Sequence, residues 1–204
     1  MNTLKTMLTA LLVTSSTFIF AQNTNVFLGD LAGENNIGNY NTFIGSVAGN
    51  RNTIGKNNTF LGYAAGYKNT TGNNNTFSGY AAGYQNTTGS KNTFLGFYAG
   101  NKNTTGSRNT FSGYYAGYQN TTGENNTYIG HYSGYTNTNG KGNVFLGYQA
   151  GQNETGSNKL YIANTSETPL IYGEFDTGRV GIGTTNFTDP THKLEVNGTI
   201  RSKE

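Results

Sequence analysis

The residues that could do acid–base or metal chemistry are few and irregularly spaced. The chain of 204 residues has two histidines, His131 and His192, no cysteine and ten carboxylates. General acid–base catalysis needs a positioned pair of titratable groups, and calcium-binding β-repeats need a repeated acidic column. Neither pattern is present, so we predict no catalytic residue, no metal site and no cofactor. The carboxylates are Asp30, Glu34, Glu124, Glu154, Glu167, Glu174, Asp176, Asp189, Glu195 and Glu204.

Tyrosines have the regular spacing that the titratable groups lack. Tyrosine faces are flat and amphipathic, which suits a sugar or a partner protein. The alternative, which we favour, is that the rings pack between the chains of a trimer or over one another along a rod. His131 takes a tyrosine position of this pattern and is expected to be an exposed substitution. The candidate tyrosines for a ligand, partner or trimer surface are Tyr63, Tyr67, Tyr80, Tyr84, Tyr114, Tyr118, Tyr135 and Tyr148.

These positions belong to a repeat of 16–17 residues. Each copy reads N-x-[FY]-x-G-x-x-[AS]-G, followed by an asparagine and by a glycine three residues later. Three glycine columns hold 24 of the 30 glycines, so glycine is positional and does not indicate disorder. The repeated aromatic residue is expected to fill a core or an interface. Its members are Phe27, Phe43, Phe60, Phe77, Phe94, Phe111, Tyr128 and Phe145.

Each copy is long enough for one turn of a flattened coil. Residues 58–62 have the β-branched and aromatic composition of a short strand, and the Ala-Gly and Thr-Thr-Gly segments suit turns. We predict two short strands and two turns per copy, each strand pairing with its equivalents above and below. The fold class is therefore all-β: a parallel β-roll or solenoid of about eight coils of 16–17 residues.

Two asparagine columns are predicted to form structural ladders. In a stack of coils, each side-chain amide can donate to one neighbour and accept from the other. A polar binding stripe is the alternative. One asparagine lies two residues before the aromatic residue, as in Asn58, Asn75, Asn92, Asn109 and Asn126. The other lies three residues before the third glycine, as in Asn69, Asn86, Asn103 and Asn120.

The phrase NTFLGYxAGxxNTTG over residues 23–158 resembles the head repeats of trimeric autotransporter adhesins and related bacterial and phage fibre proteins. This resemblance implies a left-handed β-roll with three chains side by side. The aliphatic-Gly motif of that family is matched by Leu61-Gly62 and Ile129-Gly130, whereas Ser78 and Ser112 depart from it.

Composition and the chain ends indicate export. A net charge of +3 without a Lys/Arg cluster gives no basis for nucleic-acid binding. Residues 1–21 have an early Lys5, a short apolar run and a small residue, Ala21, at the end, as in a cleavable secretory signal. The Phe-Ala-Gln ending resembles exported proteins of the Bacteroidetes. No membrane span is expected after cleavage, because no other apolar run is long enough.

Residues 159–204 leave the repeat and are richer in Ile, Leu and Val. We predict strands at 159–163, 170–175, 179–183 and 193–200, with a turn at Asp189-Pro190. The sequence RVGIGTT…HKLEVNGTIRS resembles the neck that precedes a trimeric coiled coil or a self-cleaving chaperone domain in fibre proteins. That resemblance implies a β-rich neck and leaves open whether such a domain belongs to the native product.

Two functional hypotheses follow. The first is a secreted, non-enzymatic, homotrimeric cell-surface fibre that attaches to a glycan or a surface protein of a host or the environment. The second is an ice-binding solenoid, because threonines also form columns. One column contains Thr59, Thr76, Thr93 and Thr110, and the other contains Thr71, Thr88, Thr105 and Thr122. Breaks at Asn139 and Val144, with tyrosines nearby, place this hypothesis second.

Overall fold

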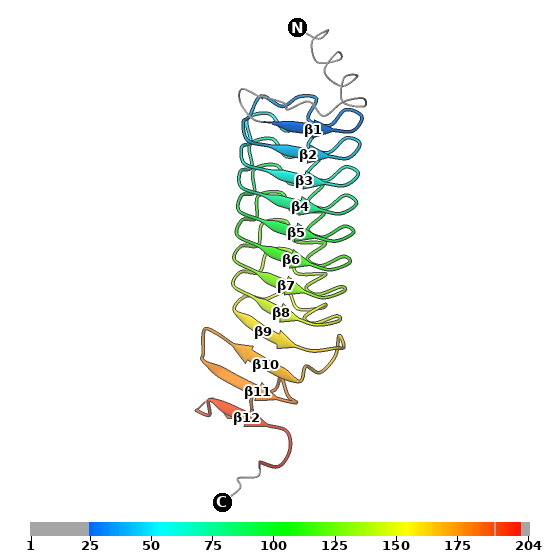
Figure 1. Cartoon of the computed structure of the whole chain (residues 1–204). Helices are drawn as coiled ribbons and strands as arrows, with labels where there is room; N and C mark the ends of the chain where they lie inside the picture. Colours follow the sequence, from blue (N-terminus) through cyan, green and yellow to red (C-terminus); the bar gives the residue numbers. More distant parts are fainter. Residues whose placement is uncertain (1–24, 190, 201–204) are drawn as a thin grey trace, which may run out of the picture.

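The protein is a rod of stacked coils (Figure 1). The computed structural model describes residues 25–189 and 191–200, so the predicted signal at 1–21 lies outside the described residues. The described residues form strands and turns without an α-helix. The all-β prediction is confirmed.

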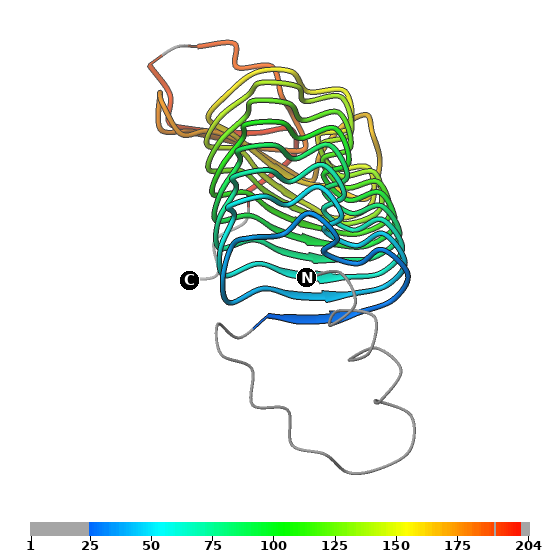
Figure 2. The same ribbon diagram turned by 90° about the horizontal axis from the view of Figure 1, so that it is seen from above.

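One sheet of twelve strands, ordered as in the sequence, runs the length of the rod. From β1 to β9 every neighbouring pair is parallel, and the register places each repeated aromatic residue beside the next, as Phe60 beside Phe77. Seen from the N-terminal end in Figure 2, the chain turns counter-clockwise as it recedes, which makes the coil left-handed. The parallel β-solenoid is thus confirmed. The strands are β1 (Val26–Leu28), β2 (Thr42–Ile44), β3 (Thr59–Leu61), β4 (Thr76–Ser78), β5 (Thr93–Leu95), β6 (Thr110–Ser112), β7 (Thr127–Ile129), β8 (Val144–Leu146), β9 (Lys159–Ile162), β10 (Ile171–Glu174), β11 (Arg179–Ile182) and β12 (Leu194–Val196).

The prediction of two strands per copy is wrong, because each repeat coil contains one. The return path of the β3 coil alternates its hydrogen bonds. The amides of Gly66 and Lys68 donate to carbonyls of the next coil, 2.9 Å away in both cases. The intervening amides of Ala65 and Tyr67 donate to carbonyls three residues back, at 3.3 and 3.2 Å. Every second amide therefore closes a local turn, and the path cannot be a strand.

The interior is a single file of aromatic rings with an alanine column beside it. Six of the eight aromatic residues are Phe with no exposed surface, Tyr128 is equally buried, and Phe27 at the first coil is half-buried. Adjacent rings are stacked with centroids 4.7–5.1 Å apart. Stacked rings at this spacing gain contact energy beyond the area they bury. The predicted core column lies inside the coil.

Glycine is required where the coil bends. Gly62 has φ +125, and a Cβ there would lie 2.6 Å from the carbonyl oxygen of Gly79 in the next coil. Gly66 has φ +59, and its Cβ would lie 2.5 Å from the ring of Phe60. Both positions combine a left-handed or extended positive φ with a close approach that only glycine allows.

The asparagine column of Asn69 forms a side-chain ladder. Asn69, Asn86, Asn103 and Asn120 each donate Nδ2 to the Oδ1 of the asparagine one coil earlier, at 2.5, 2.6, 2.7 and 2.7 Å. All four are buried. The ladder stops because Asn137 donates to the carbonyls of Glu154 and Gly156 instead.

The asparagine column of Asn58 is also buried, but its hydrogen bonds go to the backbone. Asn58 Nδ2 donates to the carbonyl of Gly72 at 2.9 Å, and Asn58 Oδ1 accepts from the amide of Asn75 at 3.0 Å. Asn75, Asn92, Asn109 and Asn126 repeat the same pattern. The amide-to-amide ladder expected for this column is therefore wrong, and the side chains tie the start of one strand to the next coil.

The tail continues the same sheet with a change of direction. β9 pairs in parallel with β8, so the parallel ladder extends one strand past residue 158. β10 is antiparallel to β9 and β11, and β12 is parallel to β11. The four strands lie within the four predicted segments and are shorter. That this part serves as a neck stays a prediction.

Candidate functional site

Aromatic side chains gather on one flank of the rod, in three columns that we call the aromatic flank. The first column lies three residues after the interior ring and contains Tyr63, Tyr80, Phe97, Tyr114, His131 and Tyr148. The second lies four residues after it and contains Tyr98, Tyr115 and Tyr132. The third lies seven residues after it and contains Tyr67, Tyr84, Tyr118 and Tyr135. The eight tyrosines singled out from the sequence are divided between the first and third columns.

Rings of the first column cover one another. Tyr63 and Tyr80 are stacked with centroids 5.0 Å apart and planes inclined by 18°. The same stacking continues from Tyr80 through Phe97 to Tyr114, at 5.1 and 5.2 Å. Within the stack these rings pack over one another along the rod, as the interpretation favoured from the sequence expects. The column presents ring edges and hydroxyl groups to solvent.

The second column was not predicted from the sequence. Tyr98, Tyr115 and Tyr132 occupy a position that is Ala, Leu, Val or Gln in the other coils, so no repeated residue type marked it. Its backbone has φ between 51 and 57° in every coil. Such a left-handed conformation points these side chains between the first and third columns. Tyr115 packs against Tyr118 at 5.0 Å, and desolvation among the neighbouring phenols raises the pKa of Tyr115.

Cations lie over the third column. The guanidinium of Arg51 is 5.2 Å from the ring centre of Tyr67, and the ammonium of Lys102 is 4.9 Å from that of Tyr118. A cation over a phenol ring is attracted by its quadrupole. The column is interrupted by Asn101, whose Nδ2 donates to the carbonyl of Ala81 at 2.9 Å.

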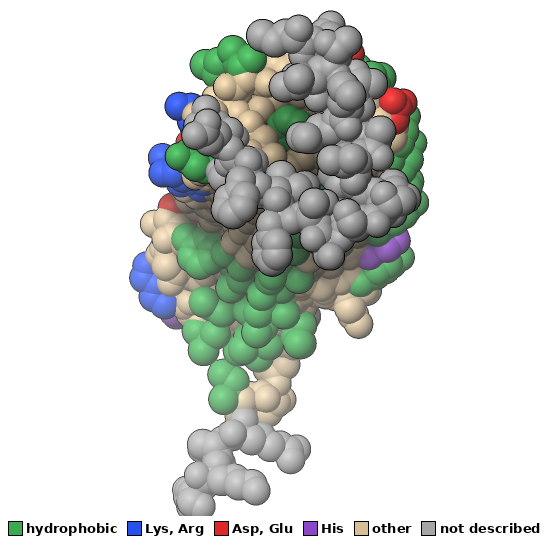
Figure 3. All heavy atoms as spheres, turned by 45° about the horizontal axis from the view of Figure 1, so that its top comes forward, with side chains coloured by type: hydrophobic (Ala, Val, Ile, Leu, Met, Phe, Trp, Pro, Cys, Tyr) green, Lys and Arg blue, Asp and Glu red, His purple; other side chains and the backbone are tan. Residues whose placement is uncertain are grey.

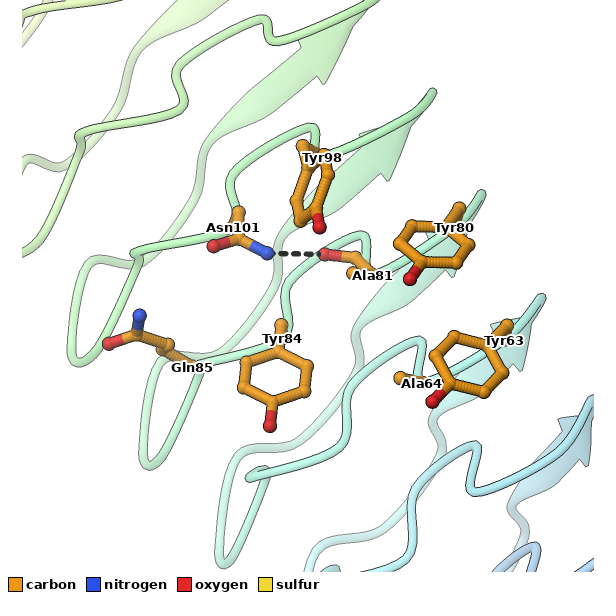
Figure 4. Close-up of a pocket in the computed structure, with 8 residues that line it drawn as sticks. All are labelled: Tyr63, Ala64, Tyr80, Ala81, Tyr84, Gln85, Tyr98 and Asn101. Atoms are coloured by element: carbon orange, nitrogen blue, oxygen red, sulfur yellow. Dashed lines mark hydrogen bonds between the residues drawn. The ribbon is translucent and has the colours of Figure 1, made fainter.

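A hollow of about 320 Å³ opens on this flank at the β3–β5 coils (Figure 4). Its size is at the lower end of the range of small-ligand sites. We call it the tyrosine hollow. Figure 4 shows the first column on one side and Tyr84 on the other, with Ala64 and Ala81 between them. Its lining residues are Tyr63, Ala64, Tyr80, Ala81, Tyr84, Gln85, Tyr98 and Asn101.

The outward side of the strands forms a second surface, which we call the strand face. Phe60 points inward, so its neighbours Thr59 and Leu61 point outward, and the register repeats this in each coil. Leu61, Leu95 and Ile129 are 47, 39 and 45% exposed. Ser78 and Ser112 occupy the same outward column, which explains why serine is tolerated there. Figure 3 shows hydrophobic side chains gathered on this face, and Lys and Arg side chains along one edge.

Titratable groups come together in the tail. Glu174 lies 3.0 Å from the ammonium of Lys159 and 2.6 Å from the guanidinium of Arg179. Burial alone would raise the pKa of Glu174, but hydrogen bonds from Lys159, Arg179 and Thr177 outweigh it and lower the pKa to about 2. Burial, reinforced by the hydrogen-bonded carboxylate of Glu154, raises the pKa of Tyr161. These contacts join β9, β10 and β11 at the base of the rod.

The histidines are separate from this network. The ring of His131 stacks on Tyr114 at 4.8 Å, and His192 lies 3.7 Å from Asp189 at the exposed end of the tail. Within residues 25–189 and 191–200, no cluster of three His, Asp or Glu side chains could hold a metal. The described part of the chain likewise has no helix able to cross a membrane.

Comparison with known proteins gives no relative. No family model, no curated protein and no solved structure matches the chain.

Proposed function

We propose that the protein is an exported, non-enzymatic structural rod that assembles as a homotrimer on the cell surface and mediates attachment. The observation that carries this proposal is the repetition of one coil in strict register, from β1 to β9. Each coil is fixed to the next by strand pairing, by ring stacking and by buried asparagines. Such a stack is stiff along its axis and displays the same outward side chains in every coil.

The strand face supports assembly. A coil this thin buries one aromatic ring and one small residue per turn, while Leu61, Leu95 and Ile129 stay in solvent. Covering an exposed aliphatic stripe removes apolar area from water and stabilises association. The tyrosine columns already pack within one chain, so we place the contact between chains on the strand face.

Light scattering of the purified chain tests the assembly. We expect a trimer at micromolar concentration. The triple variant Leu61→Lys, Leu95→Lys and Ile129→Lys should be a monomer, because each charge would have to be desolvated in the interface. The matched control is Thr88→Lys, Thr105→Lys and Thr122→Lys, at exposed positions outside the strand face. A monomeric wild-type chain would contradict the proposed trimer.

Attachment is tested separately with particles. Beads coated with the purified chain should be retained on polysaccharide or protein surfaces under flow, whereas beads coated with an unrelated protein of similar charge are washed off. Equal retention of the two bead types would contradict a role in attachment. Export is tested by N-terminal sequencing of the native product, for which we expect cleavage after Ala21.

Ice binding is the second candidate, and one observation favours it. Thr59, Thr76 and Thr93 align in register on the flat strand face, beside the aliphatic column. Val144 ends the threonine column at β8, and the tyrosines lie beyond the bend at the next glycine. Thermal hysteresis of the purified chain tests this candidate. A freezing point equal to the melting point at millimolar protein eliminates it.

A further inference from the structure

We propose that the tyrosine hollow binds an extended, uncharged saccharide chain of equatorially linked pyranose rings, lying parallel to the rod axis. This inference rests on the proposed function, because it names the ligand class through which the rod would attach. Four properties of the hollow carry it: its origin, its aromatic wall, its lining and its repeat distance.

The hollow exists because the β3 and β4 coils differ from the three coils that follow them. The second column carries Ala64 and Ala81 here, whereas Tyr98, Tyr115 and Tyr132 fill it in the following coils. The third column carries the smaller Asn101 after Tyr84. The space between the first and third columns is therefore open over the β3 and β4 coils, and the side chain of Tyr98 in the β5 coil closes it at one end (Figure 4).

Tyr84 supplies an aromatic wall of the hollow. One face of its ring stacks on Tyr67, with centroids 5.1 Å apart. Toward the next coil the third column holds Asn101 in place of a ring, and no other aromatic ring of the described chain stacks on Tyr84. The ammonium of Lys68 lies 5.5 Å from its ring centre. An aromatic ring that borders the hollow beside amide and hydroxyl groups matches a pyranose ring, which is apolar on its C–H faces and polar at its edge.

The polar groups of the hollow suit hydroxyl groups. Gln85 and Asn101 offer side-chain amides, and the tyrosines of the first column offer hydroxyl groups. Asn101 is held in place by its hydrogen bond to the carbonyl of Ala81, which leaves its Oδ1 as an acceptor. None of the lining residues is Asp, Glu, Lys or Arg. A neutral ligand with many hydroxyl groups fits this lining better than a charged one.

The repeat distance selects an extended glycan over a peptide. Equivalent rings are 5.0 Å apart in the first column and 5.1 Å apart in the third. This step is close to the length of one pyranose unit in an extended chain, so successive sugars would meet equivalent groups in successive coils. A polyproline helix advances about 3.1 Å per residue and a β-strand about 3.3 Å, so neither keeps one residue per coil.

Titration calorimetry of the full chain with β-1,4-linked glucose oligomers of two to six units tests the proposal. We expect affinity to rise with length and then to level off, because the hollow spans only a few coils. The α-1,4-linked oligomers of equal length, which curve, should bind at least about ten-fold more weakly. No heat of binding with the β-linked oligomers at millimolar concentration, or equal affinity for both series, would overturn the proposal.

A variant whose side chains fill the hollow should bind the saccharide more weakly. The double variant Ala64→Tyr and Ala81→Tyr places in the β3 and β4 coils the residue that the same column carries at Tyr98. The fold should therefore accept it, and affinity should fall about ten-fold or more as the space beside Tyr84 is occupied. Thr122→Tyr adds a tyrosine at an exposed position elsewhere and should bind as the wild type does. Unchanged affinity in the folded double variant would overturn the proposal.

A variant in which the hollow is longer gives a second test, independent of the double variant that fills it. Tyr98→Ala removes the closing side chain, so the length at which affinity levels off should move to longer oligomers. A length dependence identical to that of the wild type would contradict the proposed course of the ligand. The saccharide proposal and the proposed function can fail separately. If the chain is a trimer and its beads are retained, but the hollow binds no saccharide, only the saccharide proposal is refuted.

Discussion

Asn86 donates a hydrogen bond from its side-chain amide to that of Asn69 across 2.6 Å, one coil and seventeen residues away. The same Nδ2 donates to the carbonyl of Gly89 at 2.9 Å, and Oδ1 accepts from Asn103 at 2.7 Å. All of these groups are buried, so water cannot replace a lost partner. The side chain that makes the repeat look polar is thus an interior side chain of the rod.

Asn86→Ala should therefore destabilise the rod strongly. It leaves the Oδ1 of Asn69, the Nδ2 of Asn103 and the carbonyl of Gly89 each short of one hydrogen bond. Buried groups left unpaired cost about 1–3 kcal/mol each, so we expect a loss of about 2–5 kcal/mol in the free energy of unfolding. Chemical denaturation followed by circular dichroism measures it. Thr88→Ala, at an exposed position two residues on, is the control and should change stability by less than about 0.5 kcal/mol.

Phe94 and Phe97 lie three residues apart, but their replacement by alanine should lower the free energy of unfolding by very different amounts. Phe94 is fully buried between the rings of Phe77 and Phe111, at 4.8 and 4.9 Å. Phe94→Ala should cost about 3–5 kcal/mol of unfolding free energy, because the cavity interrupts the interior stack. Phe97 is 37% exposed on the aromatic flank, and Phe97→Ala should cost about 1 kcal/mol. Equal losses in the two variants would contradict the assignment of interior and surface columns.

Adjacent alanines should change stability with opposite sign when replaced by glycine. Ala64 has φ +53, a left-handed conformation that costs an L-residue roughly 1–2 kcal/mol. Ala64 is 3% exposed, so Ala64→Gly also removes a buried methyl group, but it relieves the backbone strain. We expect a net gain of about 0.5–1 kcal/mol in thermal or chemical denaturation. Ala65 has no exposed surface and packs in the alanine column, so Ala65→Gly should lose about 1–2 kcal/mol. A loss in both variants would contradict the expected gain from relieving the positive φ at residue 64.

The period of the sequence was sufficient to predict the architecture. A repeat of 16–17 residues with one aromatic residue admits few closed coils, and stacking places equivalent residues side by side. The path between strands could not be predicted, because a left-handed residue at a position shared by Ala, Val and Tyr leaves no compositional signal. For the same reason Tyr98 and its column were missed. The hollow could not be predicted either. It depends on where Ala64, Ala81 and Asn101 interrupt the columns, and only the structure shows where the side chains of each column point.

Glu174 joins three strands of the tail through its two carboxylate oxygens. Oε1 accepts from Lys159 of β9 at 3.0 Å, and Oε2 accepts from Arg179 of β11 at 2.6 Å. Its pKa in the folded chain is about 2, against 4.5 for an ordinary glutamate. The folded state therefore holds the charged carboxylate at a pH where the unfolded chain has already taken up a proton.

Acid should consequently loosen the tail before the repeat coils. Because the folded pKa is depressed, the stabilisation from Glu174 is fully present above pH 4.5 and declines as the pH falls, until it is lost near pH 2. The test is hydrogen exchange of the amides in β9–β11, measured across this pH interval. Their exchange rate, relative to the intrinsic rate at the same pH, should rise as the pH falls. The amides of β3–β6 are the internal control. Glu174→Gln should raise exchange in β9–β11 at neutral pH and flatten its pH dependence, because the remaining amide cannot carry the charge that Lys159 and Arg179 balance. Exchange in β9–β11 that keeps the wild-type pH dependence in Glu174→Gln would assign the acid sensitivity to another group.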